Sequence, residues 1–530
     1  MVRPKSSEAL SSNTIKRITV VLWVLFLLYG ASLVLFSREG FPVRLRFGEP
    51  FPYLADKPVG EDGYYMLTVA WNLADTGRLT YNFGELTSGV QPLATVLYGA
   101  LAFITQQLGG DKWLFTRIVL VFGVINLLVC AHLVGLIAAH LSRQHHNLSD
   151  LAYFLAFLAI AFNFELFRWF TYGLETGLYL TLLATAVLLS LRFHLTNRLS
   201  WKRVALLGAV MGLTGLARLD FGIILAGVLL LGIVSKTIKV EQALAVGAIA
   251  LLVVAPWLAY ICRLTGSFIP SSGSAQAALI SAQDIDERLL AATHALLNQL
   301  TPWVYLRVSI WLRMAAIFSL GAVLFLLLVN LNPVRLLQAT RKHHPYILIW
   351  VAAITPILLV YPLFFWAQHL YNRYFTPITI VYVPILATLL AYWLPDRSRK
   401  VQLATVMLMP LFFFGWTFRS LHTGRLGNTH VISAGYIDAN VAAAEKVGAF
   451  QSGVIGFYNS NTVNLDGKMN AEALAYRQAG NIEHYIEREG IDVLIDWKSV
   501  LATLEHDWLR RNWQPCPDFH SDFALCLVRR

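Results

Sequence analysis

The sequence predicts an α-helical polytopic membrane protein with a small α/β domain at its C-terminal end. Hydrophobic residues make up 57% of the 530 residues, charged residues only 14%, and the mean hydropathy is +0.57. Apolar runs of about 20 residues can cross a bilayer as helices, and about eleven runs qualify. They lie near residues 18–36, 113–140, 151–167, 174–192, 203–217, 219–235, 241–262, 309–330, 346–366, 375–394 and 400–418.

Basic residues alternate between successive connections, which predicts the orientation in the membrane, because Lys and Arg favour the cytoplasmic side. One set of connections is basic throughout, with Arg3, Lys5, Lys16, Arg17, Arg143, Arg198, Lys202, Arg203, Lys236, Lys239, Arg335, Arg341, Lys342, Arg397, Arg399 and Lys400. The short connections of the other set have one basic residue each: Arg168, Arg218 and Arg373. We expect a bacterial inner (plasma) membrane protein with a cytoplasmic N-terminus and a periplasmic or extracellular C-terminal domain. The net charge of +11 then reflects orientation, and no nucleic-acid partner is expected.

This orientation divides the chain into a membrane domain, residues 1–418, and an outer domain, residues 419–530. Two longer outer segments, 37–112 and 263–308, belong to the membrane domain. The first contains the apolar stretches Tyr64–Leu73 and Pro92–Thr105, which are too short to span and suit the membrane interface. The second contains an amphipathic stretch, Ala278–Leu300.

The tail alternates between predicted strands and helices. We expect strands at Val454–Phe457 and Ile491–Ile495, and helices near Asp438–Phe450 and Asn481–Glu489. A terminal hairpin is expected from the two runs Trp513–Cys516 and Phe523–Val528. Cys516 and Cys526 could join it by a disulfide in an oxidising compartment, and two unpaired thiols are the alternative.

An acidic pair, Glu61 and Asp62, stands directly before the first interfacial stretch. Carboxylates held beside apolar walls are partly desolvated, which raises their basicity and suits the abstraction of a proton from a hydroxyl. A merely solvated pair in an outer loop is the alternative.

Further ionisable residues fall at the outer ends of later helices, where charge is costly unless it is paired or functional. Arg168 and Glu175 flank one turn, and Arg218 and Asp220 interrupt one apolar stretch, so that each pair could simply neutralise itself. His369 and Arg373 bracket Tyr371 and Asn372, and Arg373 has no partner nearby in the sequence. A cation there could hold a lipid phosphate, with membrane anchoring as the alternative.

The order of these motifs resembles the GT-C glycosyltransferases, in particular the arabinofuranosyltransferase and mannosyltransferase-like branch. The resemblance rests on Glu61-Asp62-Gly-Tyr-Tyr, Ala70-Trp71-Asn72-Leu73-Ala74-x-x-Gly77, Tyr81-Asn82-x-Gly84-Glu85, Ser88-Gly89-Val90-Gln91-Pro92-Leu93, Gly173-Leu174-Glu175-Thr176-Gly177, Ala217-Arg218-Leu219-Asp220, Tyr260 through Gly266 to Pro270, Asn372-Arg373-Tyr374-Phe375-x-Pro377, Gly456-Phe457-Tyr458 and Asn464-Leu465-Asp466-Gly467. It covers nearly the whole chain. Two departures affect what it implies: Arg218-Leu219-Asp220 replaces the more usual Arg-Pro-Glu, and Glu61 stands where many relatives have a second Asp.

The resemblance implies transfer of one sugar from a polyprenyl-phosphate donor to a hydroxyl of a glycan, lipid or protein acceptor, with inversion. Asp62 would be the general base, supported by Glu61. Arg373 and His369 would stabilise the departing lipid phosphate. Contacts to the sugar or acceptor are expected from Tyr64, Gln91, Glu175, Arg218, Asp220 and Tyr371. Membrane lipid would surround the bundle, and a divalent metal (Mg or Mn) on Glu61 and Asp62 is left open.

Two other functions are also compatible with many apolar helices and a few ionisable residues near membrane depth. A transporter or flippase of a lipid-linked saccharide would place its charges near the bilayer midplane, often in repeated halves, whereas here the charges gather at one face. An oligosaccharide ligase or polymerase would share the outer-face chemistry but would use an assembled glycan, and paired Arg-rich outer loops are expected for it.

Overall fold

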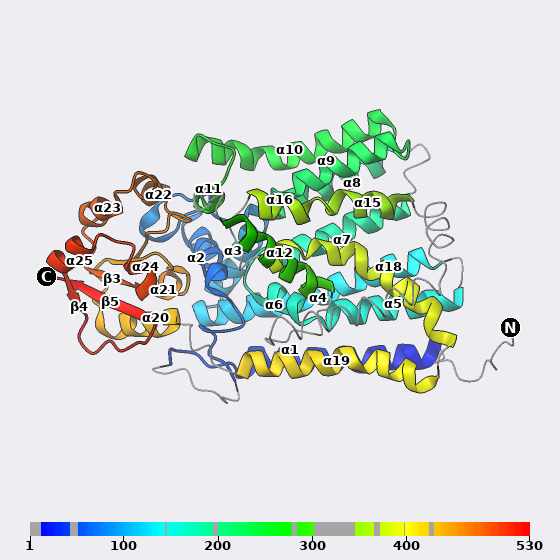
Figure 1. The fold of residues 1–530 in the computed structure, drawn as a ribbon, viewed down its shortest axis with the longest axis horizontal. Coiled ribbons are helices and arrows are strands. Elements are labelled where there is room, and N and C mark those ends of the chain that lie inside the picture. Colours follow the sequence, from blue (N-terminus) through cyan, green and yellow to red (C-terminus); the bar gives the residue numbers. More distant parts are fainter. Residues whose placement is uncertain are drawn as a thin grey trace.

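The structure is a computed structural model that describes residues 12–42, 51–143, 146–193, 200–277, 284–300, 345–364, 371–396, 398–422 and 429–530. Helices fill most of its length, and a small sheet domain closes one end (Figure 1). The helices before this domain are α1 (Ser12–Phe36), α2 (Glu61–Thr76), α3 (Pro92–Gln107), α4 (Lys112–Leu141), α5 (His146–Ala161), α6 (Phe164–Thr171), α7 (Thr176–Arg192), α8 (Trp201–Ala217), α9 (Phe221–Val234), α10 (Val240–Thr265), α11 (Ser271–Ala277), α12 (Ile285–Leu300), α15 (Pro345–Ile354), α16 (Ile357–Phe364), α17 (Tyr371–Tyr374), α18 (Pro377–Trp393) and α19 (Arg399–His422).

Four described helical segments are long and apolar enough to cross a membrane: Lys112–Leu141, Val240–Thr265, Pro345–Phe364 and Lys400–Arg419. A fifth results if the bent pair Leu148–Ala161 and Phe164–Thr171 counts as one span. Four shorter apolar helices lie at Val20–Phe36, Thr176–Arg192, Phe221–Val234 and Pro377–Trp393. The predicted run at 309–330 lies outside the described residues, so the number of about eleven spans stays a prediction.

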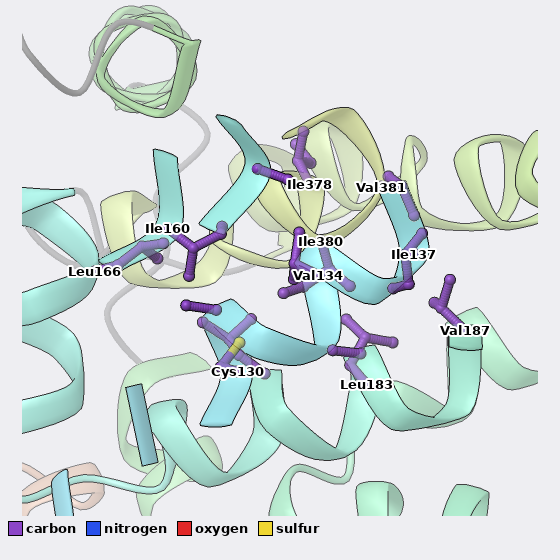
Figure 2. Packing of buried hydrophobic residues seen from close by; sticks show 14 of the residues in the cluster. Cys130, Val134, Ile137, Ile160, Leu166, Leu183, Val187, Ile378, Ile380 and Val381 are labelled. Atoms are coloured by element: carbon purple, nitrogen blue, oxygen red, sulfur yellow. The ribbon is translucent and has the colours of Figure 1, made fainter. Parts of the chain in front are cut away.

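The core of the bundle is formed where α4 packs against α5, α7 and α18. Figure 2 shows this packing, with Cys130 and Val134 of α4 facing Ile160 of α5, Leu183 of α7 and Ile380 of α18. These side chains are fully buried, and α4 is held at its start by Asp111, whose side chain accepts from the Leu114 amide at 2.9 Å. The thiol of Cys130 is therefore a core group.

The two apolar stretches of the first outer segment form α2 and α3, which lie between the bundle and the C-terminal domain (Figure 1). Helix α2 begins at Glu61, earlier than the apolar stretch suggests, so both Glu61 and Asp62 are in its first turn. It ends at Gly77, whose positive φ of 69° suits a residue without Cβ. Of the amphipathic stretch Ala278–Leu300, residues 285–300 form α12, and 278–283 lie outside the described residues.

The C-terminal domain has a five-stranded sheet in the order β2-β1-β3-β5-β4. Parallel pairing joins β1 to β2 and to β3, and antiparallel pairing joins β5 to β3 and to β4. Its elements are α20 (Thr429–Asn440), β1 (Val447–Ala449), α21 (Gly453–Tyr458), β2 (Thr462–Asn464), α22 (Ala471–Gln478), α23 (Ile482–Arg488), β3 (Val493–Trp497), α24 (Lys498–Leu501), α25 (His506–Asn512), β4 (Trp513–Pro515) and β5 (Ala524–Arg529). The predicted fold class is thus confirmed, and so is the terminal hairpin, in which Cys516 and Cys526 form a disulfide.

Two predictions in the tail are wrong. The segment Val454–Phe457 is the middle of helix α21 and not a strand, because its first amides are bound by a carboxylate of α2 that local sequence cannot reveal. The predicted helix Asp438–Phe450 is split, since α20 ends at Asn440 and β1 follows. Gly448 makes β1 possible, because a Cβ at this position would lie 2.9 Å from the Leu494 side chain of the neighbouring strand.

Candidate functional site

The first turn of α2 lies against the turn that leads into α7. The Gly60 amide donates to the Tyr172 carbonyl at 3.1 Å. A Cβ at Gly63 would be 2.0 Å from the same carbonyl, so only glycine allows this approach. Residues far apart in sequence, Asp62 and Glu175, are thereby brought to the same end of the bundle.

Asp62 faces a lysine that the C-terminal domain supplies. The Lys468 ammonium is 3.5 Å from Asp62 Oδ1 and 3.2 Å from Asp466 Oδ2, and it lies 5.5 Å from the ring centre of Tyr65. Burial disfavours the charged ammonium, but the carboxylates of Asp466 and Asp62 outweigh this effect and raise the pKa of Lys468. Asp62 is thus ion-paired with a cation from the C-terminal domain.

Glu61 points away from this ion pair, into the interface with the C-terminal domain. Its carboxylate accepts hydrogen bonds from the amides of Gly453 and Val454, the latter at 3.0 Å, at the start of α21. Burial raises the pKa of Glu61 to about 8, although these two amides act in the opposite direction. Glu61 and Asp62, although adjacent in the first turn of α2, therefore have different partners: Glu61 binds backbone amides and Asp62 binds a lysine ammonium.

Other polar contacts fix the loop after β1 against α2. Tyr65 Oη donates to the Phe450 carbonyl at 3.2 Å and accepts from the Ser452 amide at 2.9 Å, and Tyr81 Oη donates to the Ser452 carbonyl at 2.8 Å. Asp496 of β3 accepts the amides of Phe450 and Gln451 at 2.8 and 2.7 Å. Burial nevertheless raises the pKa of Asp496 to about 6. The C-terminal domain is thus docked by hydrogen bonds next to Asp62.

The second group of charges lies where α8 ends and α7 begins, and it centres on Glu175. Glu175 Oε1 is 3.3 Å from Arg373 Nη2 and 3.9 Å from Arg218 Nε, and its side chain is 1% exposed. Arg218 also binds Asp220 at 2.6 Å and donates to Tyr361 Oη at 2.8 Å. Arg373, without a partner nearby in the sequence, thus has one from α7.

Aromatic rings enclose this second group. The guanidinium of Arg218 lies 5.2 Å from the ring centre of Tyr179 and 4.9 Å from that of Tyr374, and Arg373 lies 5.1 Å from Tyr374. Tyr374 in turn stacks on Tyr361 with ring centres 4.3 Å apart. The cations are therefore held in a fixed and largely dry setting.

Electrostatics connect the two groups. Burial disfavours the charged form of Arg373, and Glu175 is the largest opposing influence, with Asp62 acting in the same direction. The pKa of Arg373 is raised as a result. Asp62, which could take a proton, and Arg373, which could hold an anion, are therefore close enough to influence each other electrostatically.

The remaining predicted site residues differ in their surroundings. Tyr64 is fully buried and donates to the Leu54 carbonyl at 2.7 Å, and Tyr371 is fully buried beside the ring of Phe375. Gln91 precedes α3, and its buried Oε1 accepts no hydrogen bond from the described residues. Arg168 lies over the rings of Trp169 and Tyr172, whereas His369 is outside the described residues.

The acidic pair does not suit a divalent metal as the structure arranges it. Glu61 is engaged by backbone amides and Asp62 by a lysine ammonium, a cation that would compete with the metal. Among the described residues, no three or more His, Cys, Asp or Glu side chains gather as metal ligands usually do. No chemical step is therefore derived through a metal.

Sequence reasoning missed Lys468. The motif Asn464-Leu465-Asp466-Gly467 ends one residue before it, and an Asp-Gly turn followed by a basic residue was the available signal. Its partner Asp62 lies 406 residues earlier, so only the fold reveals the pair.

Comparisons with known proteins identify the fold. The sequence matches no protein-family model and no curated protein. The crystal structure of ArnT from Cupriavidus metallidurans bound to undecaprenyl phosphate superposes with a TM-score of 0.59 at 11% identity, covering 96% of this chain and 98% of that chain. The apo state of the same protein gives 0.58 at 12% identity, with the same coverage.

A second similar structure is the Archaeoglobus fulgidus oligosaccharyltransferase in its apo form. Its TM-score is 0.53 at 13% identity, covering 95% of this chain and 74% of that chain. At such low identities these likenesses establish the fold alone. That fold is the one implied by the GT-C resemblance of the sequence.

Proposed function

We propose that this chain, which has the GT-C glycosyltransferase fold, transfers a single sugar from a polyprenyl-phosphate donor to an acceptor hydroxyl. The observation that carries the proposal is a carboxylate, Asp62, within electrostatic range of a buried cation, Arg373, which is itself paired with Glu175 in an apolar helical bundle. A donor with a long apolar tail and a phosphate needs a lipid-facing bundle and a cation at its end. The acceptor is a glycan, lipid or protein that approaches from the C-terminal domain.

The donor class is supported by the similar fold of ArnT, whose crystal structure contains undecaprenyl phosphate. In this chain Arg373, whose side chain is 11% exposed, would bind the phosphate. His369, four residues earlier, is proposed as a second phosphate contact. Negative charge grows on the phosphate as the sugar bond breaks, so these contacts stabilise the transition state more than the substrate.

Asp62 is the proposed general base. Its side chain is 23% exposed, so an acceptor hydroxyl can reach it, and the Lys468 ammonium lies 3.5 Å from its Oδ1. Glu61 supports this role by holding the C-terminal domain, and with it Lys468, against α2. Attack from the face of the sugar opposite to the phosphate gives inversion.

Sugar or acceptor contacts are proposed for Glu175, Arg218 and Asp220. Of these, Asp220 has the most accessible side chain, at 27% exposure. Gln91 is proposed as a further contact because its buried Oε1 accepts no hydrogen bond within the described residues. The full burial of Tyr64 and Tyr371 supports packing roles for these two rings.

The proposed setting is a bacterial inner membrane, with the N-terminus cytoplasmic and residues 419–530 outside. Two observations support it. The Cys516–Cys526 disulfide fits an oxidising compartment, and α2, whose first turn contains Asp62, lies beside the C-terminal domain, opposite to the N-terminal end of α1 (Figure 1). Single cysteines introduced at exposed positions within residues 429–530 should react with a membrane-impermeant thiol reagent added to intact cells. Absence of labelling would contradict this setting.

A second candidate function is transfer of an assembled oligosaccharide, which the fold likeness to the A. fulgidus oligosaccharyltransferase favours. A transporter or flippase has less support, because the two charged groups described above lie at one end of the bundle.

Purified protein incubated with undecaprenyl-phosphate-linked monosaccharides, together with a bacterial cell-envelope extract that supplies acceptor hydroxyls, tests the proposal, with acceptor-dependent release of undecaprenyl phosphate as the readout. We expect release from at least one monosaccharide donor, and its loss in Asp62→Asn. Release only from oligosaccharide-linked donors would favour the second candidate, and no release from either donor would contradict both.

A further inference from the structure

The Lys468 side chain joins the C-terminal domain to Asp62, and its backbone is fixed on several sides. The Lys468 amide donates to Asp466 Oδ1 at 2.8 Å, and the Lys468 carbonyl accepts from Ser271 Oγ of α11 at 2.8 Å. Gly89 of the first outer segment closes another side, because a Cβ there would be 2.0 Å from the same carbonyl. The side chain therefore starts from a fixed point among three segments.

The contacts of the ammonium itself are incomplete. It lies 3.5 Å from Asp62 and 3.2 Å from Asp466 Oδ2, yet that oxygen accepts no hydrogen bond from the described residues. An ammonium group has three donors and turns freely on a flexible stem. The Lys468 side chain as a whole is 18% exposed, so a stronger anionic acceptor could reach it and draw the ammonium away from Asp62.

The cations of the bundle are already matched by carboxylates. Arg218 is paired with Asp220 and Arg373 with Glu175, all within the Glu175 group. A phosphate brings several acceptor oxygens and negative charge, so it is bound better by two cations than by one. Lys468 is well placed to be the second, because it contacts Asp62, which itself acts electrostatically on Arg373.

We propose that Lys468 is a ligand of the donor phosphate, and that it leaves Asp62 when the donor binds. This inference rests on the proposed function and adds the order of its events. Without donor, Lys468 holds Asp62. With donor bound, the ammonium moves to the phosphate, and Asp62, no longer paired with Lys468, takes the proton of the acceptor hydroxyl. The exchange makes and breaks only ion pairs.

Titration of the full-length protein with undecaprenyl phosphate tests this exchange. Lys468→Met is expected to weaken binding by about tenfold to a hundredfold, the value of a hydrogen bond between charged groups. Lys468→Arg keeps the charge and is expected to stay within about threefold of the unaltered protein. Lys446→Met is the matched control, because Lys446 is also ion-paired in the C-terminal domain, but with Glu489.

Asp62→Asn gives the sharper test. Removing one of the two competing carboxylates leaves Lys468 ion-paired with Asp466, so the ammonium is held less strongly and this inactive variant is expected to bind undecaprenyl phosphate about tenfold more tightly. In the Lys468→Met background the same substitution is expected to change binding by less than about twofold. A simple loss of repulsion between Asp62 and phosphate would instead give the same gain in both backgrounds.

Three results would overturn the exchange: unchanged affinity in Lys468→Met, equal gains in the two backgrounds, or an equal loss in Lys446→Met. If Lys468→Met does not fold, Lys468→Gln replaces it, because its amide can still donate to Asp62 and Asp466 without the charge. No binding of undecaprenyl phosphate by the unaltered protein would contradict the proposed function itself. If the unaltered protein binds undecaprenyl phosphate and Lys468→Met binds it equally well, only the exchange would be contradicted.

Discussion

The two charged groups of this molecule are built in opposite ways. The Glu175 group comes from the bundle alone: its two arginines are matched by two carboxylates and enclosed by the rings of Tyr179, Tyr361 and Tyr374. The Asp62 group is shared between α2 and the C-terminal domain, and it has one ammonium between two carboxylates. The first group is balanced and fixed, whereas the second is unbalanced and partly accessible.

This difference suggests a division of labour. Buried, matched ion pairs seldom change partners, because each partner would be left desolvated and alone. A group with incomplete contacts at the junction of two domains can exchange partners at lower cost. We therefore expect substitutions in the Asp62 group to affect turnover, and substitutions in the Glu175 group to affect the fold or donor affinity.

The largest effect is expected from Asp62→Asn, which removes the proposed base. Sugar transfer should fall by about 10²–10⁴-fold, the usual contribution of general base catalysis, while the thermal unfolding temperature stays close to that of the unaltered protein. Asp75→Asn is the matched control, because Asp75 is exposed near the other end of α2. Normal turnover by Asp62→Asn would remove Asp62 from the mechanism.

Glu175→Gln is expected to have the next largest effect, this time on stability. It leaves two buried guanidinium groups without their shared counter-charge, which should cost about 3–5 kcal/mol in the free energy of unfolding. Thermal unfolding in detergent measures this loss, with Glu241→Gln in the exposed first turn of α10 as the control. Equal unfolding of the two variants would mean that the Glu175 group is not a fixed unit.

Arg373→Ala should weaken undecaprenyl phosphate binding by about tenfold to a hundredfold, because a charged hydrogen bond to the phosphate is lost. Arg78→Ala, which removes an exposed arginine of the first outer segment, is expected to leave affinity unchanged. A titration in which the two variants bind equally well would contradict the phosphate role of Arg373.

The docking of the C-terminal domain is expected to depend on pH. The pKa of Glu61 is raised by burial from 4.5 to about 8, so its stabilising contribution is complete below about 4.5 and is lost as pH rises through about 8. The pKa of Asp496 is raised from 3.8 to about 6 and has the same sign over a lower range. Thermal unfolding should therefore occur at lower temperature as pH rises, and Glu61→Gln should flatten this profile between about pH 4.5 and 8, most clearly above about pH 6, where Asp496 no longer contributes. If the unfolding temperature of Glu61→Gln depends on pH as it does in the unaltered protein, titratable groups other than Glu61 cause the pH dependence.

The sequence was sufficient to predict those parts that depend on local pattern. The apolar runs predicted α4, α7 and α10, and the runs around Cys516 and Cys526 predicted the terminal hairpin. These elements form because their own residues favour them, with little help from distant segments.

Features that depend on distant contacts were not predictable in this way. Helix α21 has residues that favour a strand, and it is helical where Glu61, 393 residues away from Val454, accepts its first amides. The partner of Arg373 is Glu175, 198 residues earlier, and Lys468 has no neighbour in sequence that reveals its contact with Asp62. Chemical type could be inferred for Asp62 and Arg373, but their partners required the fold.

Mass spectrometry of the lipid that remains bound to the purified, full-length protein tests the central claim most directly. We expect a polyprenyl phosphate that carries one sugar, with more of it retained by Asp62→Asn than by the unaltered protein, because the inactive variant cannot consume its donor. A lipid-linked oligosaccharide would contradict the transfer of a single sugar. Ordinary phospholipid alone in both proteins would contradict the polyprenyl-phosphate donor.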